Sequence, residues 1–63
     1  MQLTIRAARV NRGFTQEKVA KELGVSKKTV SSWEKGKTTP RLSMIEPLCN
    51  LLNVKYDDIK WSV

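Results

Sequence analysis

One stretch of the chain, residues 15 to 36 (TQEKVAKELGVSKKTVSSWEKG), constrains the fold more than any other. It contains two short runs with helical patterning, and Gly24 separates them. A glycine at this point can adopt a left-handed conformation without the penalty that a Cβ would impose. Thr15 and Ser26 each precede one of the runs and supply a hydroxyl that caps the first free N–H groups of a helix. The stretch therefore predicts two helices joined by a tight turn.

The second of these helices has an apolar side and a polar side. At about 100° per residue, Val30 and Trp33 project to one side, with Glu34 on the flank. The opposite side carries only basic and hydroxyl residues: Lys27, Lys28, Ser31, Ser32 and Lys35. A merely solvated helix face is the alternative, but such a face normally mixes acidic with basic residues. We interpret this side as the DNA-reading face of a helix-turn-helix.

The motif and its surroundings resemble the Cro/CI-type, or XRE-type, helix-turn-helix of phage repressors and bacterial regulators. The resemblance extends from about Ile5 to Ile59 and rests on IRAARVNRGFTQEKVAKELGVSKKTVSSWEKGKTTP followed by LLNVKYDDI. It implies an all-α fold, a compact five-helix bundle of the lambda-repressor-like type. Residues 1–63 are then expected to form a single DNA-binding domain.

The resemblance also assigns DNA contacts. It places Gln16 at the N-terminus of the second helix, where the family holds a DNA phosphate, and the dipole of a helix attracts an anion there independently. The base-reading positions fall on Lys27, Lys28 and Ser32, with Ser31 nearby. Because lysine donates to guanine O6 and N7, we expect a G·C pair under Lys27 or Lys28 in each half-site. Further phosphate contacts are expected from Thr15, Thr29, Lys35, Lys37, Thr38 and Arg41.

Arg9 and Glu34 match a pair that, in the family, forms a buried or half-buried salt bridge between the first helix and the end of the third. Arg9 shares a helix face with the apolar Ile5 and Ala8, and a charge on such a face needs an internal partner. We therefore expect an architectural role for the pair. Direct contact between Arg9 and DNA is the alternative.

The positive charge is concentrated in one part of the sequence. Up to Arg41 there are ten basic and three acidic residues, whereas from Leu42 onward two basic residues face three acidic ones. The first part is thus net +7, and it contains the polar helix face and the loop after it. This distribution favours a polyanionic partner and phosphate contacts from the loop, with an ordinary solvated loop as the alternative.

The composition argues against catalysis and metal binding. The chain has no histidine, which excludes imidazole chemistry and histidine metal ligands. The single cysteine, Cys49, has the helical spacing of a core residue, with a redox sensor as the alternative. Asp57 and Asp58 are expected at the start of the fifth helix, where they complement its dipole. We therefore expect no enzymatic activity, no cofactor and no metal site.

The remaining elements follow from start and stop signals. We expect a first helix from about Leu3 to Arg12, closed by Gly13. Ser43, with Glu46 three residues later, predicts a capping box that starts the fourth helix at Met44 and leaves Pro47 in its first turn. The expected core consists of apolar residues at helical spacings: Phe14, Val19, Leu23, Val25, Val30, Leu48, Leu52, Val54 and Ile59.

The C-terminal segment is unusually apolar, since Tyr56 and Trp61 lie near Val54, Ile59 and Val63. Family members often pair as symmetric dimers through this region, which would place two reading helices about 34 Å apart. The alternative is that Trp61 folds back onto its own core. Because no stretch is long and apolar enough to span a membrane and the N-terminus lacks a signal peptide, we expect a cytoplasmic protein.

Three functional hypotheses remain. The first is a sequence-specific regulator of transcription, a repressor that binds double-stranded DNA as a homodimer on a two-fold symmetric operator. The second is the DNA-binding antitoxin of a toxin–antitoxin pair, with a protein partner on the apolar C-terminal strip. The third is a helical protein-interaction module without DNA binding.

Overall fold

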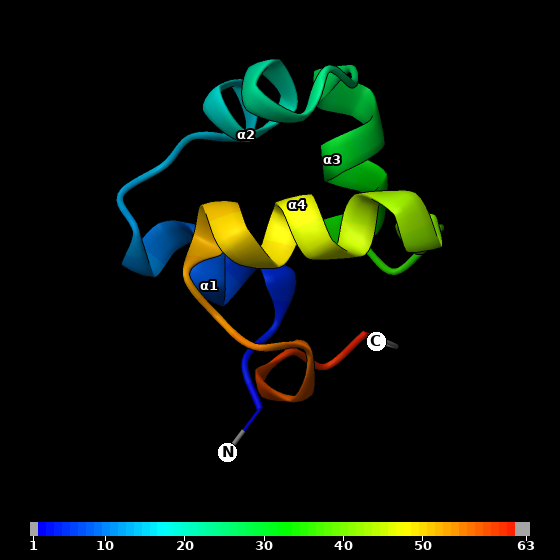
Figure 1. Cartoon of the computed structure of the whole chain (residues 1–63). Coiled ribbons are helices and arrows are strands. Elements are labelled where there is room, and N and C mark those ends of the chain that lie inside the picture. Colours follow the sequence, from blue (N-terminus) through cyan, green and yellow to red (C-terminus); the bar gives the residue numbers. More distant parts are fainter. Residues whose placement is uncertain (1, 62–63) are drawn as a thin grey trace.

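The computed structural model describes residues 2–61, and these residues form four α-helices and one 3-10 turn. The elements are α1 (Ile5–Asn11), α2 (Gln16–Leu23), α3 (Lys27–Glu34), α4 (Leu42–Leu52) and the 3-10 turn η1 (Tyr56–Asp58). In Figure 1, α4 crosses the middle of the molecule, with α2 above it and η1 below it. The expected all-α class is confirmed, because the described part contains helices and one isolated β-bridge but no strand.

The first three helices begin where hydroxyl side chains cap them. Thr4, Thr15 and Ser26 each accept a hydrogen bond from the backbone N–H three residues later, at 3.0 to 3.1 Å. Gly24 ends α2 with a φ of 71°, in the left-handed region. Both helices of the motif therefore start at the residues that the sequence predicted, and α2 ends at the predicted glycine, because local side-chain chemistry and backbone preference determine those positions.

The start of α1 differs from the expected Leu3. Leu3 instead forms a parallel β-bridge with Ile59. Its N–H donates to the carbonyl of Asp58 at 2.7 Å, and its own carbonyl accepts from the N–H of Lys60 at 2.8 Å. This pairing keeps Leu3 extended, so the helix can begin only at Ile5.

The predicted start of α4 is wrong. The helix begins at Leu42, two residues before Met44, and Arg41 is its N-cap residue without a side-chain capping bond. The backbone of Arg41 is extended, and its carbonyl already accepts from the N–H of Met44 at 2.8 Å. Ser43 is therefore helical and cannot cap. Pro47 consequently lies in the second turn, where it lacks the N–H that would bond the carbonyl four residues earlier.

The expected fifth helix is only the 3-10 turn η1. Asn53 takes a left-handed conformation after α4, with a φ of 56°, and the chain is extended at both Lys55 and Ile59. Only Tyr56–Asp58 remain between those extended residues, which is too short for an α-helix. The Asp58 carboxylate accepts from the N–H of Lys55 at 2.9 Å, so it caps this turn.

The core lies between the helices and includes residues from all of the α-helices. All nine expected core residues belong to it or pack against it. Four of them are only partly buried: Phe14, Leu23, Val25 and Val54. The core also contains four residues outside that list: Ile5, Ala8, Ala20 and Trp33, of which Trp33 was already expected on the apolar side of its helix. Cys49 is buried as well, and its burial, followed by the negative charge of Asp58, raises the pKa of its thiol.

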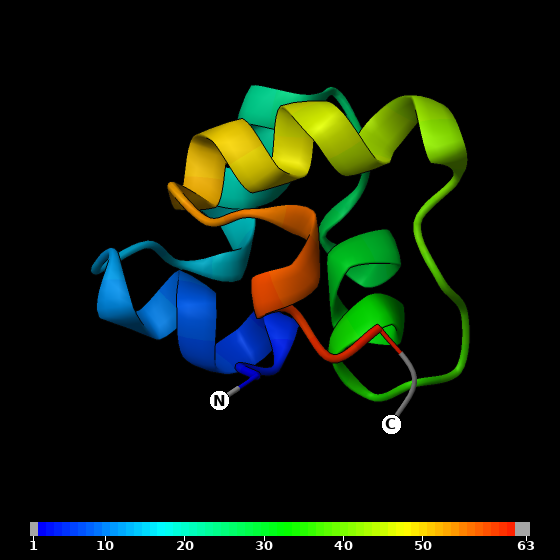
Figure 2. The same ribbon diagram turned by 60° about the horizontal axis from the view of Figure 1, so that its bottom comes forward.

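Trp61 folds back onto its own chain. It is partly buried against the core, and its ring stacks on Tyr56 with 5.4 Å between centroids. Its indole N–H donates to the carbonyl of Tyr56 at 3.0 Å. Figure 2 shows this end of the chain below α4. Val63, which the sequence analysis grouped with these residues, lies outside the described residues.

Candidate nucleic-acid interface

The α2–α3 unit presents the polar face of α3 away from the core. No other pair of helices packs as extensively as α2 and α3. Val30 and Trp33 are buried, which fixes the rotation of α3 and turns its opposite side outward. On that side two residues are exposed, Lys27 and Lys28, and two are half-buried, Ser31 and Ser32. The expected base-reading residues therefore share one helix face, with the two lysines in its first turn.

Glu34 connects three helices at the end of α3. Its carboxylate accepts from Arg9 Nε at 2.6 Å and from Arg9 Nη2 at 3.2 Å. The side chains are 12% and 5% exposed, and Arg9 Nη1 also donates to the carbonyl of Phe14 at 2.7 Å. The Arg9 guanidinium is thus occupied inside the protein. The resulting contacts hold α3 in a fixed orientation relative to α1.

The side chain of Gln16 also binds Glu34, because its Nε2 donates to Oε1 at 2.9 Å. Sequence reasoning did not anticipate this contact, which joins the start of α2 to the end of α3. The Thr15 hydroxyl at the same helix end accepts the capping bond from the Lys18 N–H. Helix geometry leaves the N–H groups of Gln16 and Glu17 without an acceptor inside the helix. One N–H of the Gln16 amide is thus used inside the protein, and the free backbone N–H groups at this end of α2 are available to an anion.

The loop after α3 continues the basic surface. Its N-terminal part is bonded to the helix, because the N–H of Lys37 donates to the carbonyl of Ser32 at 3.0 Å. The loop residues expected to contact phosphate are all exposed: Lys35, Lys37, Thr38 and Arg41. Thr29 is half-buried, and its hydroxyl lies 2.9 Å from that of Ser26. The exposed basic residues of the loop thus follow directly after α3 in the chain, and Thr29 takes part in the N-terminal cap of α3.

Two ion pairs involve the acidic residues of α2. Lys18 and Glu22 pair along the helix at 2.8 Å, and the Lys18 ammonium lowers the pKa of the Glu22 carboxyl. Glu17 instead reaches Lys27 in the first turn of α3, with 3.7 Å between Oε1 and Nζ. The i,i+4 spacing predicts the first pair from sequence. The second pair crosses between helices, so only the packing of α2 on α3 reveals it.

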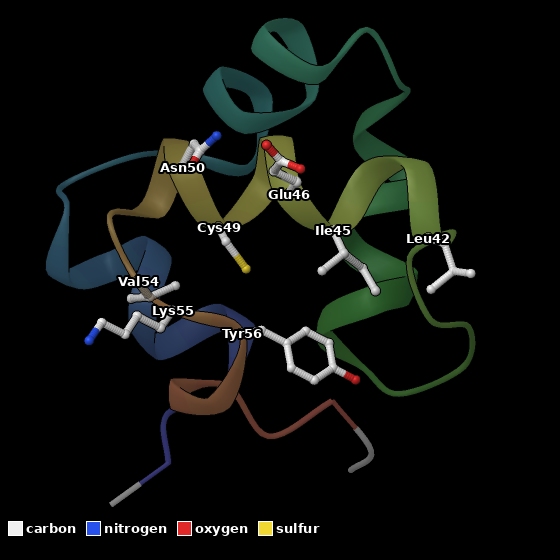
Figure 3. A pocket seen from close by; sticks show the side chains of 8 residues that line it. All are labelled: Leu42, Ile45, Glu46, Cys49, Asn50, Val54, Lys55 and Tyr56. Atoms are coloured by element: carbon white, nitrogen blue, oxygen red, sulfur yellow. The ribbon is translucent and has the colours of Figure 1, made fainter.

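A second surface feature lies between α4 and η1. It is a groove whose apolar lining includes Leu42 and Tyr56, which are 88% and 56% exposed (Figure 3). Glu46 and Lys55 place opposite charges along the same groove. Its full lining is Leu42, Ile45, Glu46, Cys49, Asn50, Val54, Lys55 and Tyr56. Of the apolar C-terminal strip expected from the sequence, only Val54 and Tyr56 line this groove, because Ile59 is buried in the core and Trp61 packs against Tyr56.

Neither a metal site nor a membrane helix is found in the part of the chain that the structure describes. Residues 2–61 contain no group of three or more Cys, Asp or Glu side chains placed to hold a metal ion. Among the same residues, no helix has the length and apolar character needed to cross a membrane.

Comparison with known proteins agrees with this geometry. Residues 5–59 match the family model described as Helix-turn-helix, HTH_3. The uncharacterized HTH-type transcriptional regulator YgzD of Bacillus subtilis is 31% identical over 97% of this chain and 92% of its own length. The cryptic phage CTXphi transcriptional repressor RstR of Vibrio cholerae is 42% identical over 87% of this chain, which spans only 50% of that repressor.

A solved structure shares the fold as well. The crystal structure of the hypothetical transcription factor NHTF from Neisseria superposes with a TM-score of 0.75 at 33% identity. The match covers 86% of this chain and 61% of that one. The family match spans the capped α2–α3 unit, the Glu34 contacts and the basic loop. The chain therefore belongs to the Cro/CI-type (XRE) family of helix-turn-helix DNA-binding proteins that regulate transcription.

Proposed function

We propose that the protein is a sequence-specific repressor of transcription that inserts α3 into the major groove of double-stranded DNA. The observation that carries this proposal is the outward face of α3, where Lys27 and Lys28 are exposed on a helix fixed by buried contacts. The likeness to a phage transcriptional repressor favours repression. A protein that occupies an operator in this way blocks access by the polymerase.

The contacts divide into two classes. Lys27, Lys28, Ser31 and Ser32 read base edges, because lysine donates to guanine and serine can serve several bases. The start of α2 binds a phosphate through its free N–H groups, which Gln16 aligns through its bond to Glu34. The remaining phosphate contacts come from Thr15, Thr29 and the loop residues Lys35, Lys37, Thr38 and Arg41.

The protein acts as a homodimer through the groove between α4 and η1. Leu42 and Tyr56 supply exposed apolar area, and the opposite charges of Glu46 and Lys55 allow two copies to pair symmetrically. Sedimentation of Leu42→Glu against the native chain tests this surface. A loss of dimer in the variant supports it, whereas a native chain that is monomeric at all accessible concentrations refutes it.

Selection from a random pool of DNA duplexes at near-physiological salt tests the proposed function. A two-fold symmetric motif with half-sites one helical turn apart, and a G·C pair in each, is the expected result. Retention without any sequence preference would contradict specific recognition.

A second function, a DNA-binding antitoxin, is favoured by the same exposed groove. In that case the groove holds a toxin instead of a second copy. Copurification with the product of an adjacent gene, together with binding to that gene's own promoter, would distinguish this function from simple repression.

A further inference from the structure

The first turn of α3 lacks an acidic residue of its own. Lys27 and Lys28 occupy its first two positions, and no Asp or Glu follows within the turn. Positive side chains at this end oppose the helix dipole, whose N-terminus is itself positive. The positive charges of Lys27 and Lys28, two of the proposed base-reading residues, are therefore unfavourable at this end of the helix.

Glu17, in the first turn of α2, supplies the missing negative charge. Its carboxylate lies 3.7 Å from the Lys27 ammonium, and the two side chains are 77% and 61% exposed. An exposed pair of this kind contributes little to folding stability. The position of the pair is more informative, because the pair joins the first turn of α2 to the first residue of α3, the helix proposed to read bases.

The neighbouring Gln16 cannot take this role. Its side chain is held by Glu34, on the inner side of the α2–α3 unit. The other acidic residue of α2, Glu22, is bonded to Lys18 along the same helix. Of the side chains at the start of α2, the structure joins only Glu17 to a residue expected to read bases.

We propose that Glu17 is a specificity-determining residue that restrains Lys27 and weakens DNA complexes made through phosphates alone. This inference rests on the proposed function. In a complex without base contacts, Lys27 is free to neutralise a phosphate, and the Glu17 carboxylate opposes this by competing for the Lys27 ammonium. In the specific complex, the guanine contact of Lys27 compensates for that opposition. Specificity is a difference between two affinities, so a group that penalises the wrong complex increases it.

The test uses Glu17→Gln, which removes the charge and keeps the shape of the side chain. Glu22→Gln is the matched control, since it removes the same charge from an exposed ion pair on the same helix. Affinities of the full chain are measured for the selected operator and for a scrambled duplex between about 0.05 M and about 0.2 M salt. Releasing Lys27 to one further phosphate should steepen the salt slope on scrambled DNA by about 0.9, which is roughly a threefold change in affinity across this range.

The expected result is specific to Glu17. Glu17→Gln should lower the ratio of operator to scrambled affinity, and this loss should be about threefold greater at about 0.05 M than at about 0.2 M salt, while Glu22→Gln leaves the ratio unchanged. In a Lys27→Met background the effect of Glu17→Gln should disappear. Equal behaviour of the two variants, or an effect that persists without Lys27, would overturn the inference while leaving the proposed function intact. A native chain without DNA binding would instead overturn both.

Discussion

Replacing Glu34 with alanine should destabilise the protein by about 3 kcal/mol. The carboxylate accepts three hydrogen bonds, two from Arg9 and one from Gln16, and it is 5% exposed. Removing one partner of a buried ion pair costs about 3 to 5 kcal/mol. Arg9 keeps its bond to the Phe14 carbonyl and is 12% exposed, so water can reach it. Both facts place the expected loss at the lower end of that range.

Such a loss is large for a chain of 63 residues, whose total stability is expected to be about 3 to 9 kcal/mol. Urea denaturation, followed by the fluorescence of Trp33 and Trp61, measures it. Glu34→Gln retains an acceptor for Gln16 and should fall between the native chain and Glu34→Ala. Glu22→Ala, which breaks an exposed pair, should leave the midpoint unchanged. A loss below about 1 kcal/mol for Glu34→Ala would refute the reasoning, because it would mean that the three bonds are replaced by solvent at little cost.

Three further outcomes are expected. Lys28→Met should change the preferred base at one position of the operator, whereas Lys37→Met should weaken all duplexes alike and reduce the salt slope by about 0.9, both measured by binding titrations. Identical behaviour of these two variants would contradict the division into base and phosphate contacts. Pro47→Ala should stabilise the fold by about 1 kcal/mol in urea denaturation, because it restores a helix hydrogen bond at an exposed position. A loss of stability would instead show that contacts of the proline ring stabilise the fold. Gly24→Ala should cost about 1 kcal/mol of conformational energy, since the φ is 71° and no atom lies within 4 Å of the added Cβ, so a much larger loss would indicate a rearranged turn.

The parts of the fold that sequence predicts best are those determined by neighbouring residues. Both limits of α2 and the start of α3 follow from Thr15, Gly24 and Ser26, whose side-chain and backbone preferences act within one turn. The start of α4 was not predictable in the same way. Ser43 has the right chemistry for a cap, but Arg41 turns the chain into the helix two residues earlier. A capping residue does not determine the start of a helix when the backbone already enters the helical conformation before that residue.

Contacts that depend on packing between helices could be predicted from the sequence only in part. Arg9 and Glu34 could be paired in advance because a charge on an apolar face requires a partner. The same reasoning does not lead to Gln16, which is polar, uncharged and able to remain in solvent. Glu17 and Lys27 are ten positions apart on different helices, so their approach depends on how α2 crosses α3. The roles of the expected DNA-contacting residues remain predictions until binding is measured.

The β-bridge between Leu3 and Ile59 bears on the order in which the protein assembles. It joins residues 56 positions apart, whereas only residues 24–26 separate α2 from α3. The entropy lost on closing a segment grows with its length, so we expect the two helices of the motif to meet early and the ends of the chain to come together late. Opening should follow the reverse order. The chain can then loosen where its two ends meet while the α2–α3 unit stays formed.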